Sequence, residues 1–449
     1  MRRHTSIALG FLVLIFIGAV MLAAPFSQVS GNWGRLADNI FTAFSAVCVT
    51  GLTVVDIASV YTRTGQYIII ALVEVGCLGL MTCGTFVLIA IGRRLSLSRE
   101  FSLMNAYGVA QVQGLRGLIC WIVGSMAALE AIGALGYYFL MPSVLPGRDD
   151  YLYLSIFYSV MSFCNAGFSI LPGSLAAFAK SPALILLSAV LTMFGGIGFL
   201  VIYNLCTYKI LRRKAGGHGR LTLHTKIVLR YTGYLLTIGF VAFLVVEWSG
   251  TLAEMPLMEK LWTAFYQAVT PRTCGFCLVP TENLQPLTRL VYEMLMFIGG
   301  GPGSAAAGIK VTTFAVLCYT LTAMCRGETE TVIRKRTIPA DIVRESLVIL
   351  MALIVITALV TGALFHTESA SVASGAVSLD ALFFEAVSAV TTTGLSVGST
   401  TASLTIPGRV VILFAMFVGR LGALTVVMMI GDRESNRRVR FPTEELVVG

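Results

Sequence analysis

The segment 379–422 reads LDALFFEAVSAVTTTGLSVGSTTASLTIPGRVVILFAMFVGRLG. It begins with a short apolar run (379–391), which ends in the motif Thr392-Thr393-Gly394-Leu395, and it continues into a long apolar stretch that carries Gly419 and Gly422. The short run cannot cross a bilayer core as a helix, because a crossing takes about 20 residues. The segment therefore predicts a re-entrant half-helix followed by a membrane-spanning helix.

The same pattern occurs three more times along the chain. Short apolar runs at 39–49, 153–164 and 258–270 end in Val49-Thr50-Gly51-Leu52, Asn165-Ala166-Gly167-Phe168 and Thr273-Cys274-Gly275-Phe276. The long stretches that follow carry Gly76/Gly79, Gly195/Gly198 and Gly300/Gly303, so the first and last glycines of the four units lie 28, 31, 28 and 28 residues apart. Glycine is frequent in membrane helices, but frequency alone does not produce three identical spacings. The register predicts a fourfold internal repeat.

The composition is that of an integral membrane protein. Hydrophobic residues make up 56% of the 449 residues and charged residues 12%, against about 25% charged in soluble domains. This excludes a soluble enzyme and a disordered chain. The first apolar stretch follows Arg2 and Arg3, as in a signal peptide, but it is longer than the usual apolar core of about 7–15 residues. We therefore expect eight spans, at 7–26, 66–91, 115–142, 181–208, 226–248, 286–325 (interrupted), 343–366 and 408–430.

Each unit crosses the membrane twice, so all four have the same orientation and are related by an axis along the membrane normal. The predicted fold is an all-α membrane protein with eight transmembrane helices plus four re-entrant pore helices. They form four parallel helix–pore-loop–helix repeats around a pseudo-fourfold pore. The units are 1–94, 95–214, 215–335 (with a broken second helix) and 336–449, which ends in a short cytoplasmic tail.

The distribution of the 32 Lys and Arg residues predicts the orientation. They concentrate at 2–3, 93–116, 209–230, 326–344 and 433–440, and the positive-inside rule makes that side, with both termini, cytoplasmic. We thus expect a multi-pass protein of the cell membrane. The net charge of +9 follows from this topology, and no nucleic-acid partner is needed to explain it. The opposite side is assigned Arg35, Arg63, Arg148, Lys180, Lys260, Arg272, Arg289 and Arg409.

Four half-helices that end in glycine motifs on one axis predict a cation pore. Glycine adopts positive φ, which lets backbone carbonyls point inward and replace the hydration shell of an ion. The C-termini of the half-helices add partial negative charge. Because these motifs contain no carboxylate, a monovalent cation is the expected ligand. The predicted filter residues are Val49, Thr50, Gly51, Asn165, Ala166, Gly167, Thr273, Cys274, Gly275, Thr392, Thr393 and Gly394.

The interrupted sixth span predicts a gate. Irregular backbone at membrane depth has to be buried in protein or line a wet cavity, so we expect a movable barrier below the filter; an ordinary proline kink stays open as the alternative. A phosphate-binding loop is disfavoured because Ile309 separates Gly308 from Lys310. The predicted gate residues are Gly299, Gly300, Gly301, Pro302, Gly303, Ser304, Ala305, Ala306, Ala307, Gly308, Lys310 and Arg420.

Charged residues inside the spans are the other candidates. Arg420 is expected to repel a cation and to donate to carbonyls of the broken span; a structural salt bridge to Glu74 or Glu293 is the alternative. Lys310 either belongs to the gate or extends toward the cytoplasmic interface. Glu385 is expected to accept hydrogen bonds from amides behind the filter. Zinc at Cys274 and Cys277 is disfavoured, because it needs about four ligands. The four histidines form no cluster, and no enzyme is expected.

The four glycine motifs, the broken helix 297–310 and Gly419-Arg420-Leu421-Gly422 resemble the Trk/Ktr/HKT superfamily of potassium transporters, specifically the Ktr-type membrane subunit, over essentially the whole chain. The resemblance implies potassium uptake, with K⁺ at the filter carbonyls, Na⁺ as an activator and no covalent cofactor. It also implies a homodimer in membrane lipid and a cytosolic nucleotide-binding regulatory ring subunit. A nucleotide is then expected to act on this chain only through that partner.

The chain departs from the family pattern at Cys274 in the third filter segment. It also departs at Ala305-Ala306-Ala307, and these alanines predict a broken-span loop that is stiffer or more helical than in the family. The alternative function is a sodium- or proton-coupled secondary potassium transporter. It is disfavoured by the parallel repeats and by the lack of a mid-membrane carboxylate pair in matched units.

Overall fold

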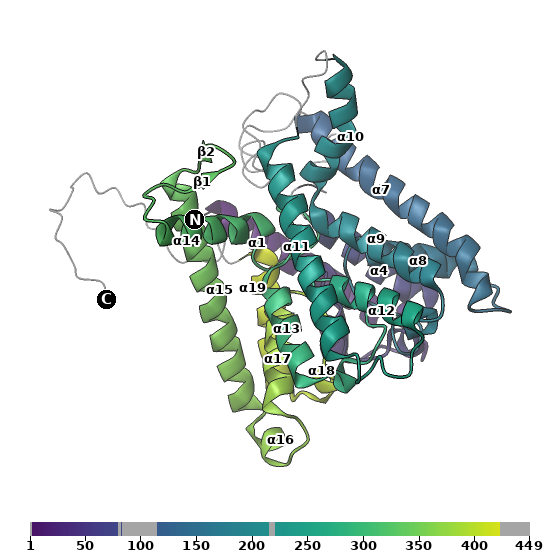
Figure 1. Ribbon diagram of the computed structural model, residues 1–449. Coiled ribbons are helices and arrows are strands. Elements are labelled where there is room, and N and C mark those ends of the chain that lie inside the picture. The colour runs from purple at the N-terminus through teal and green to yellow at the C-terminus, as the bar shows by residue number, and fades with distance from the viewer. Residues whose placement is uncertain (1, 80–81, 83–114, 215–220, 423–449) are drawn as a thin grey trace.

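The computed structural model describes residues 2–79, 82, 115–214 and 221–422, and nearly all of its regular structure is helical (Figure 1). Parts of the predicted spans 66–91 and 408–430, the unit boundary at 94/95 and the C-terminal tail lie outside the described residues. The boundary at 214/215 adjoins another such gap.

Each unit contains a short apolar helix with one further helix before it and one after it in the chain. The short helices are α2 (Leu36–Val47), α8 (Tyr151–Phe163), α12 (Leu257–Val269) and α17 (Leu379–Val390). The helices before them are α1 (Arg2–Ala23), α7 (Leu115–Leu140), α11 (Leu223–Val246) and α15 (Ala340–Thr367). The helices after them are α4 (Arg63–Leu78), α9 (Pro182–Ile197), α13 (Pro286–Phe297) and α19 (Ile406–Leu421). Each short helix packs against the helix that precedes it in its unit.

The contacts between units close a ring in sequence order. Helix α4 packs on α8, α9 on α12, α13 on α17, and α19 on α2. Ion pairs connect three of these four junctions: Arg63 with Asp150 (3.6 Å), Arg289 with Asp380 (2.9 Å) and Arg409 with Asp38 (3.1 Å). Each Asp lies at or just before the N-terminal turn of a short helix, where negative charge is stabilised by the helix dipole.

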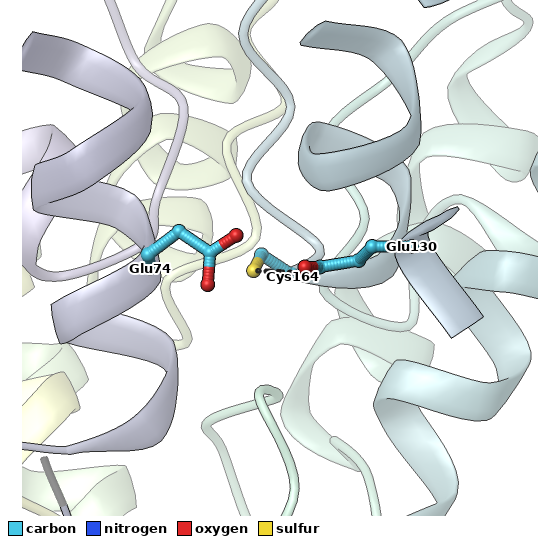
Figure 2. A group of neighbouring side chains, drawn as sticks. All are labelled: Glu74, Glu130 and Cys164. Carbon is cyan, nitrogen blue, oxygen red and sulfur yellow. Dashed lines mark hydrogen bonds between the residues drawn. The ribbon is translucent and has the colours of Figure 1, made fainter. Parts of the chain in front are cut away.

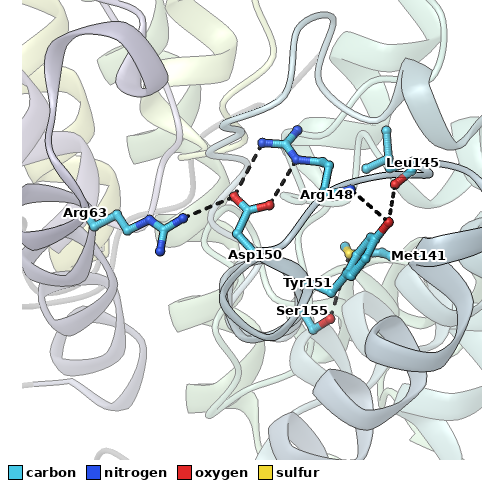
Figure 3. Close-up of polar contacts among 7 residues, drawn as sticks. All are labelled: Arg63, Met141, Leu145, Arg148, Asp150, Tyr151 and Ser155. Atoms are coloured by element: carbon cyan, nitrogen blue, oxygen red, sulfur yellow. Dashed lines mark hydrogen bonds and ion pairs between the residues drawn. The ribbon is translucent and has the colours of Figure 1, made fainter.

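Figure 3 shows the first of these junctions, between units 1 and 2. Asp150 accepts from Arg148 of its own loop, with 3.0 Å between Oδ1 and Nε, and faces Arg63 at the start of α4. The Tyr151 hydroxyl donates to the carbonyl of Leu145 at 2.6 Å, which holds this loop against the start of α8. The junction therefore fixes the starts of α4 and α8 relative to each other.

The other elements connect these helices. They are η1 (Pro25–Ser27), α3 (Ile57–Val60), η2 (Met141–Ser143), η3 (Ala176–Phe178), α10 (Phe199–Lys214), η4 (Thr281–Asn283), α14 (Val311–Cys325), α16 (Ser369–Ala373) and α18 (Thr400–Ser403). Strands β1 (Val332–Ile333) and β2 (Arg336–Thr337) form an antiparallel hairpin, and the predicted unit boundary at 335/336 falls in its turn. Helix α15 runs from this hairpin to α16 at the opposite end (Figure 1).

Within the described residues, three helices are long and apolar enough to cross a membrane by themselves: Gly117–Ser143, Leu223–Val246 and Ala340–Thr367. The predicted span 181–208 is not one continuous helix, because α9 and α10 meet at an angle of 100°; counted as one broken span, the pair would raise the number to four. Gly198 between them has φ of +102°, a left-handed conformation that ends helices and that glycine adopts without steric cost. The total of eight spans stays a prediction.

The first glycine of the Gly-x-x-Gly motif allows two backbones to approach in three units. A Cβ on Gly76, Gly195 or Gly419 would lie closer than 3.0 Å to the carbonyl oxygen of the last residue in the preceding short helix, which is Val47, Phe163 or Val390. In units 1, 2 and 4 these glycines therefore bring the helix after the glycine motif against the C-terminus of the short helix before it.

Gly195→Ala is expected to destabilise the protein, because the added methyl meets the backbone of Phe163 and not a movable side chain. Overpacking of this kind costs about 1–3 kcal/mol. Thermal unfolding of the purified protein measures the effect as a lower midpoint. Gly124→Ala in α7 is the matched control, since nothing lies within 4 Å of its Cβ position. Equal midpoints for the two variants would contradict the close approach.

Candidate functional site

The four glycine segments (49–51, 165–167, 273–275 and 392–394) share an unusual backbone conformation. Their first residues all have positive φ, at 55° for Val49, 57° for Asn165, 64° for Thr273 and 47° for Thr392. Their last residues, Gly51, Gly167, Gly275 and Gly394, have φ between 66° and 94°. In each segment the first and third residues are thus left-handed. In an extended strand successive carbonyls point in alternating directions, and the two left-handed residues interrupt this alternation. Four segments that are far apart in the sequence thus adopt the same unusual backbone conformation.

The four glycines form a closed ring. A Cβ on Gly51 would lie 3.0 Å from the Cα of Gly167, and one on Gly167 would lie 2.9 Å from the Cα of Gly275. A Cβ on Gly275 would lie 3.5 Å from the Cα of Gly394, and one on Gly394 would lie 3.3 Å from the Cα of Gly51. The segments therefore follow one another around a common axis in chain order, and the ring has no room for side chains.

The short helices point their C-termini at this ring. Helices α2, α8 and α17 end four residues before the ring glycine of their unit, and α12 ends six residues before Gly275. The partial negative charge of a helix C-terminus favours a cation. The hydroxyls of Thr50, Thr273 and Thr392 are buried and have no hydrogen-bond partner in the described part of the chain. A buried oxygen without a hydrogen-bond partner needs an explanation. A bound cation would explain these three hydroxyl oxygens, because oxygen atoms can coordinate it.

One side of the ring opens into a cavity of about 370 Å³. Gly51 and Gly394 line it, together with residues 52–56 and with Ser396, Ser399 and Thr401. Asp56 supplies a carboxylate to this lining, and a negative charge in a mouth attracts cations. The cavity therefore reaches the ring at two of its four glycines, Gly51 and Gly394.

Two predicted residues support the segments from behind. The Cys274 thiol lies 3.4 Å from the Thr192 hydroxyl and 3.7 Å from that of Tyr266, whereas Cys277 contacts Thr281. The two thiols thus have different partners. Glu385 accepts from the hydroxyls of Ser396 and Thr401, in the first case at 2.8 Å. The expected backbone amide partners of Glu385 are replaced by these hydroxyls, which the loop after Gly394 brings back onto α17.

The broken-helix loop (298–310) joins α13 to α14 and contains the predicted gate residues 299–308 and Lys310. Its ends are tied together, because the Gly299 amide donates to the Ile309 carbonyl at 3.0 Å and the Val311 amide to that of Gly300 at 3.0 Å. Its middle pairs with the break between α9 and α10. The amides of Gly301 and Ala305 donate to the carbonyls of Gly196 and Gly195, at 2.8 and 3.2 Å, and the Phe199 amide donates to Gly303 at 3.0 Å. The two breaks therefore satisfy each other's backbone groups.

Of the two expectations for Ala305-Ala306-Ala307, the more helical loop is wrong, and the stiffer loop stays a prediction. These residues are buried but lie in no helix. Their carbonyls have other partners: Ala305 accepts from Arg420 at 2.6 Å and Ala306 from the Lys310 ammonium at 2.5 Å. Lys310 thus turns back onto its own loop. These bonds replace the i to i−4 bonds that would otherwise favour a helix.

Arg420, in the last turn of α19, joins three units. One guanidinium nitrogen donates to Ala305 in the broken-helix loop and another to the carbonyl of Gly76 at the end of α4. Within the described ranges Arg420 forms no ion pair with Glu74 or Glu293, the alternative considered from the sequence. The contact with the loop carbonyl is present, and its role as a gate stays a prediction.

Arg272, which the charge pattern assigns to the side opposite the cytoplasm, has a buried side chain, with 7% of the residue exposed. Its Nη2 donates to the Gly299 carbonyl at 2.9 Å and its Nη1 to that of Thr232 at 3.5 Å. The positive-inside rule counts residues by their position between apolar runs, and here the side chain turns inward from a re-entrant segment.

Sequence reasoning missed Glu130. Figure 2 shows Glu74 of α4 and Glu130 of α7 directed toward each other, with Cys164 between them. One ligand atom from each of the three residues lies within 4.8 Å of the others, and the Cys164 thiol donates to Glu130 at 3.6 Å. Both carboxylates interrupt apolar stretches, which is a signal the sequence offers for each, but their proximity depends on packing between units 1 and 2.

Known proteins resemble this chain over nearly its full length. The TrkH family, described as cation transport protein, matches residues 5–437. Potassium uptake protein B of the Ktr system of Bacillus subtilis is 34% identical over 99% of this chain and 96% of its own length. The potassium/sodium uptake protein NtpJ of Enterococcus hirae is 33% identical over the same shares. The crystal structure of the potassium transporter TrkH from Vibrio parahaemolyticus matches 95% of this chain and 84% of its own, with a TM-score of 0.72 at 16% identity.

Proposed function

Because this chain belongs to the TrkH family of cation transport proteins, we propose that it takes up potassium across the cell membrane through a channel-like pore. The observation that carries the proposal is the closed ring of Gly51, Gly167, Gly275 and Gly394. In this reading the four glycine segments are the selectivity filter, and their backbone carbonyls replace the hydration shell of K⁺. The names of the two relatives, for potassium uptake and for potassium/sodium uptake, support the choice of ion.

The gate in this proposal is the broken-helix loop. Its backbone is tied to α9 on one side and to Arg420 on another. Arg420 places a positive charge beside the loop and bonds its carbonyl, so both electrostatics and hydrogen bonding favour a closed path. Lys310 adds a second cation that bonds Ala306 within the same loop.

We extend the proposal to assembly and orientation, which rest on the family resemblance and on charge. The chain is a homodimer in membrane lipid, both termini are cytoplasmic, and a cytosolic ring of nucleotide-binding subunits regulates it, with Na⁺ as activator. The turn of the β1–β2 hairpin supports a docking surface for such a partner, because Arg334, Lys335 and Arg336 are all exposed there.

The test is cation flux into proteoliposomes that hold the purified protein. Uptake of K⁺ and Rb⁺ well above that of Na⁺, driven by the cation gradient alone, is the expected result. Flux without preference among the three ions would contradict the filter. Regulation is tested by adding the separately purified cytosolic subunit, which is expected to change the rate and not the ion preference.

The buried carboxyl pair Glu74 and Glu130 favours one second candidate, a sodium- or proton-coupled transporter. Intramembrane carboxylates are common parts of ion-coupling sites. Glu74→Gln together with Glu130→Gln is expected to leave K⁺ flux within about twofold if the pore is channel-like, because neither residue touches the glycine ring. Flux is measured with and without imposed pH and sodium gradients. Gradient-dependent wild-type uptake that the double variant loses would favour coupling.

A further inference from the structure

Unit 3 differs from the others at the joint between its short helix and its glycine segment. Six residues separate the end of α12 from Gly275, against four in the other units. The backbone bonds change accordingly: the Cys274 amide donates four residues back, to Thr270, whereas the amides of Thr50, Ala166 and Thr393 each donate five residues back. The longer joint contains Pro271 and Arg272. The unit with this joint is also the unit with the broken-helix loop.

The Arg272 side chain connects these two features. Its backbone immediately precedes the third glycine segment, and its Nη2 reaches the carbonyl of Gly299, two residues beyond the end of α13. Its Nη1 contacts the Thr232 carbonyl of α11 at 3.5 Å. One buried side chain therefore joins the ring of glycines to the first residues of the loop.

The charge of Arg272 is compensated by backbone and not by a carboxylate. No described Asp or Glu forms an ion pair with it. A small cavity of about 20 Å³ beside it is lined by Val269, Ile197 and Gly300, which lie at or just beyond the C-termini of α12, α9 and α13. Helix C-termini carry partial negative charge, and a buried charge requires such compensation. In the described part of the chain, the partners of the Arg272 guanidinium are thus the carbonyls of Gly299 and Thr232, and three helix ends lie close by.

We propose that Arg272 is a positioning residue that fixes the start of the broken-helix loop to the third glycine segment, while Arg420 fixes its middle through Ala305. The inference rests on the proposed function and deepens it. The loop cannot move away from its observed position without breaking a contact that originates beside the ring. Loop opening and the geometry of the third segment therefore depend on each other.

The first test compares Arg272→Met, Arg272→Lys and wild type in proteoliposomes, by Rb⁺ uptake and by competition with Na⁺. Arg272→Met is expected to raise uptake about fivefold and to lower the K⁺/Na⁺ preference about threefold. Arg272→Lys is expected to raise uptake about twofold, because one ammonium does not reproduce two guanidinium contacts. Arg148→Met is the matched control, since Arg148 is exposed and pairs with Asp150 of its own loop.

If Arg272 connects the broken-helix loop to the third glycine segment, its removal changes both flux and selectivity. A residue that only restrains the loop would change flux alone. Arg272→Met with both quantities equal to wild type would overturn the role of Arg272. If this variant does not assemble, wild-type uptake in Arg272→Lys would overturn it instead. A wild type without K⁺-preferring flux would count against the proposed function only.

The second test needs no ion flux. Ser304 lies in the loop, and Ser304→Cys reports its exposure through the rate of reaction with a water-soluble thiol reagent, after subtraction of the rate for the parent protein. Adding Arg272→Met is expected to raise this rate about fivefold, and adding Arg148→Met is expected to leave it unchanged. Equal rates in the Arg272 and Arg148 backgrounds would show that Arg272 does not restrain the loop.

Discussion

Gly394→Ser is expected to lower the preference for K⁺ over Na⁺ by about tenfold or more. Gly394 has φ of +85°, which a side chain rarely adopts, and a Cβ there meets the carbonyl of Thr50 in the neighbouring segment. Backbone strain of this kind costs about 1–3 kcal/mol, and about 1.4 kcal/mol corresponds to a factor of ten in an equilibrium constant. The ring relieves the strain by moving carbonyls away from the axis, which removes the close coordination that selects the larger, more easily dehydrated ion.

The measurement is the ratio of K⁺ to Na⁺ uptake, with Gly362→Ser as control. Gly362 lies in α15, and nothing is within 4 Å of its Cβ position, so a serine there is expected to leave the ratio unchanged. Gly51→Ser should resemble Gly394→Ser, because its Cβ also meets a backbone carbonyl, that of Ala166. Wild-type ratios in all four ring variants would rule out the ring as the filter.

Arg420→Ala is expected to raise K⁺ flux about tenfold at an unchanged K⁺/Na⁺ ratio. The variant removes the hydrogen bonds to Ala305 and Gly76 together with a positive charge beside the path. A hydrogen bond from a charged group contributes about 1.5–3 kcal/mol, so the loss of one such restraint is enough for a change of this size. The readout is the initial rate of Rb⁺ uptake per reconstituted protein.

Arg409→Ala provides the control on the same helix. Arg409 pairs with Asp38 at the start of α2 and contacts no residue of the broken-helix loop. The Arg409→Ala variant tests whether the loss of any arginine contact between units raises the rate of Rb⁺ uptake. Lower flux and poor assembly in Arg420→Ala, with normal flux in Arg409→Ala, would favour a purely structural role for Arg420.

The positions of the repeated elements were predictable because they follow from local rules. Helix length against bilayer thickness separates the runs at 39–49, 153–164, 258–270 and 379–391 from longer stretches, and short helices lie at all four places. The first residue of each glycine segment could be located from its position two residues before a glycine. That Val49, Asn165, Thr273 and Thr392 all adopt positive φ was not predictable, since only tertiary packing stabilises that conformation in residues other than glycine.

The contacts that the sequence does not predict are those between side chains and partners distant in sequence. The place of Arg272 between apolar runs predicts a side of the membrane, but it does not predict that the guanidinium donates to Gly299. The position of Glu130 opposite Glu74 depends on how α7 lies relative to α4, which the sequence does not specify. The bend at Gly198 lies within a continuous apolar stretch and could not be predicted, because hydropathy contains no information about the direction of the backbone.

The sequence by itself determined the membrane class, the fourfold repeat, the glycine segments and the break in the sixth span, since composition, length and spacing are properties of the chain alone. Tertiary structure decided which groups meet: the order of the four glycines around one axis, the pairing of the broken-helix loop with the end of α9, and the contacts of Arg272 and Arg420 with loop carbonyls. Hydrogen bonds and close backbone contacts act over only a few ångströms. They therefore depend on distances in space that spacing along the chain does not specify.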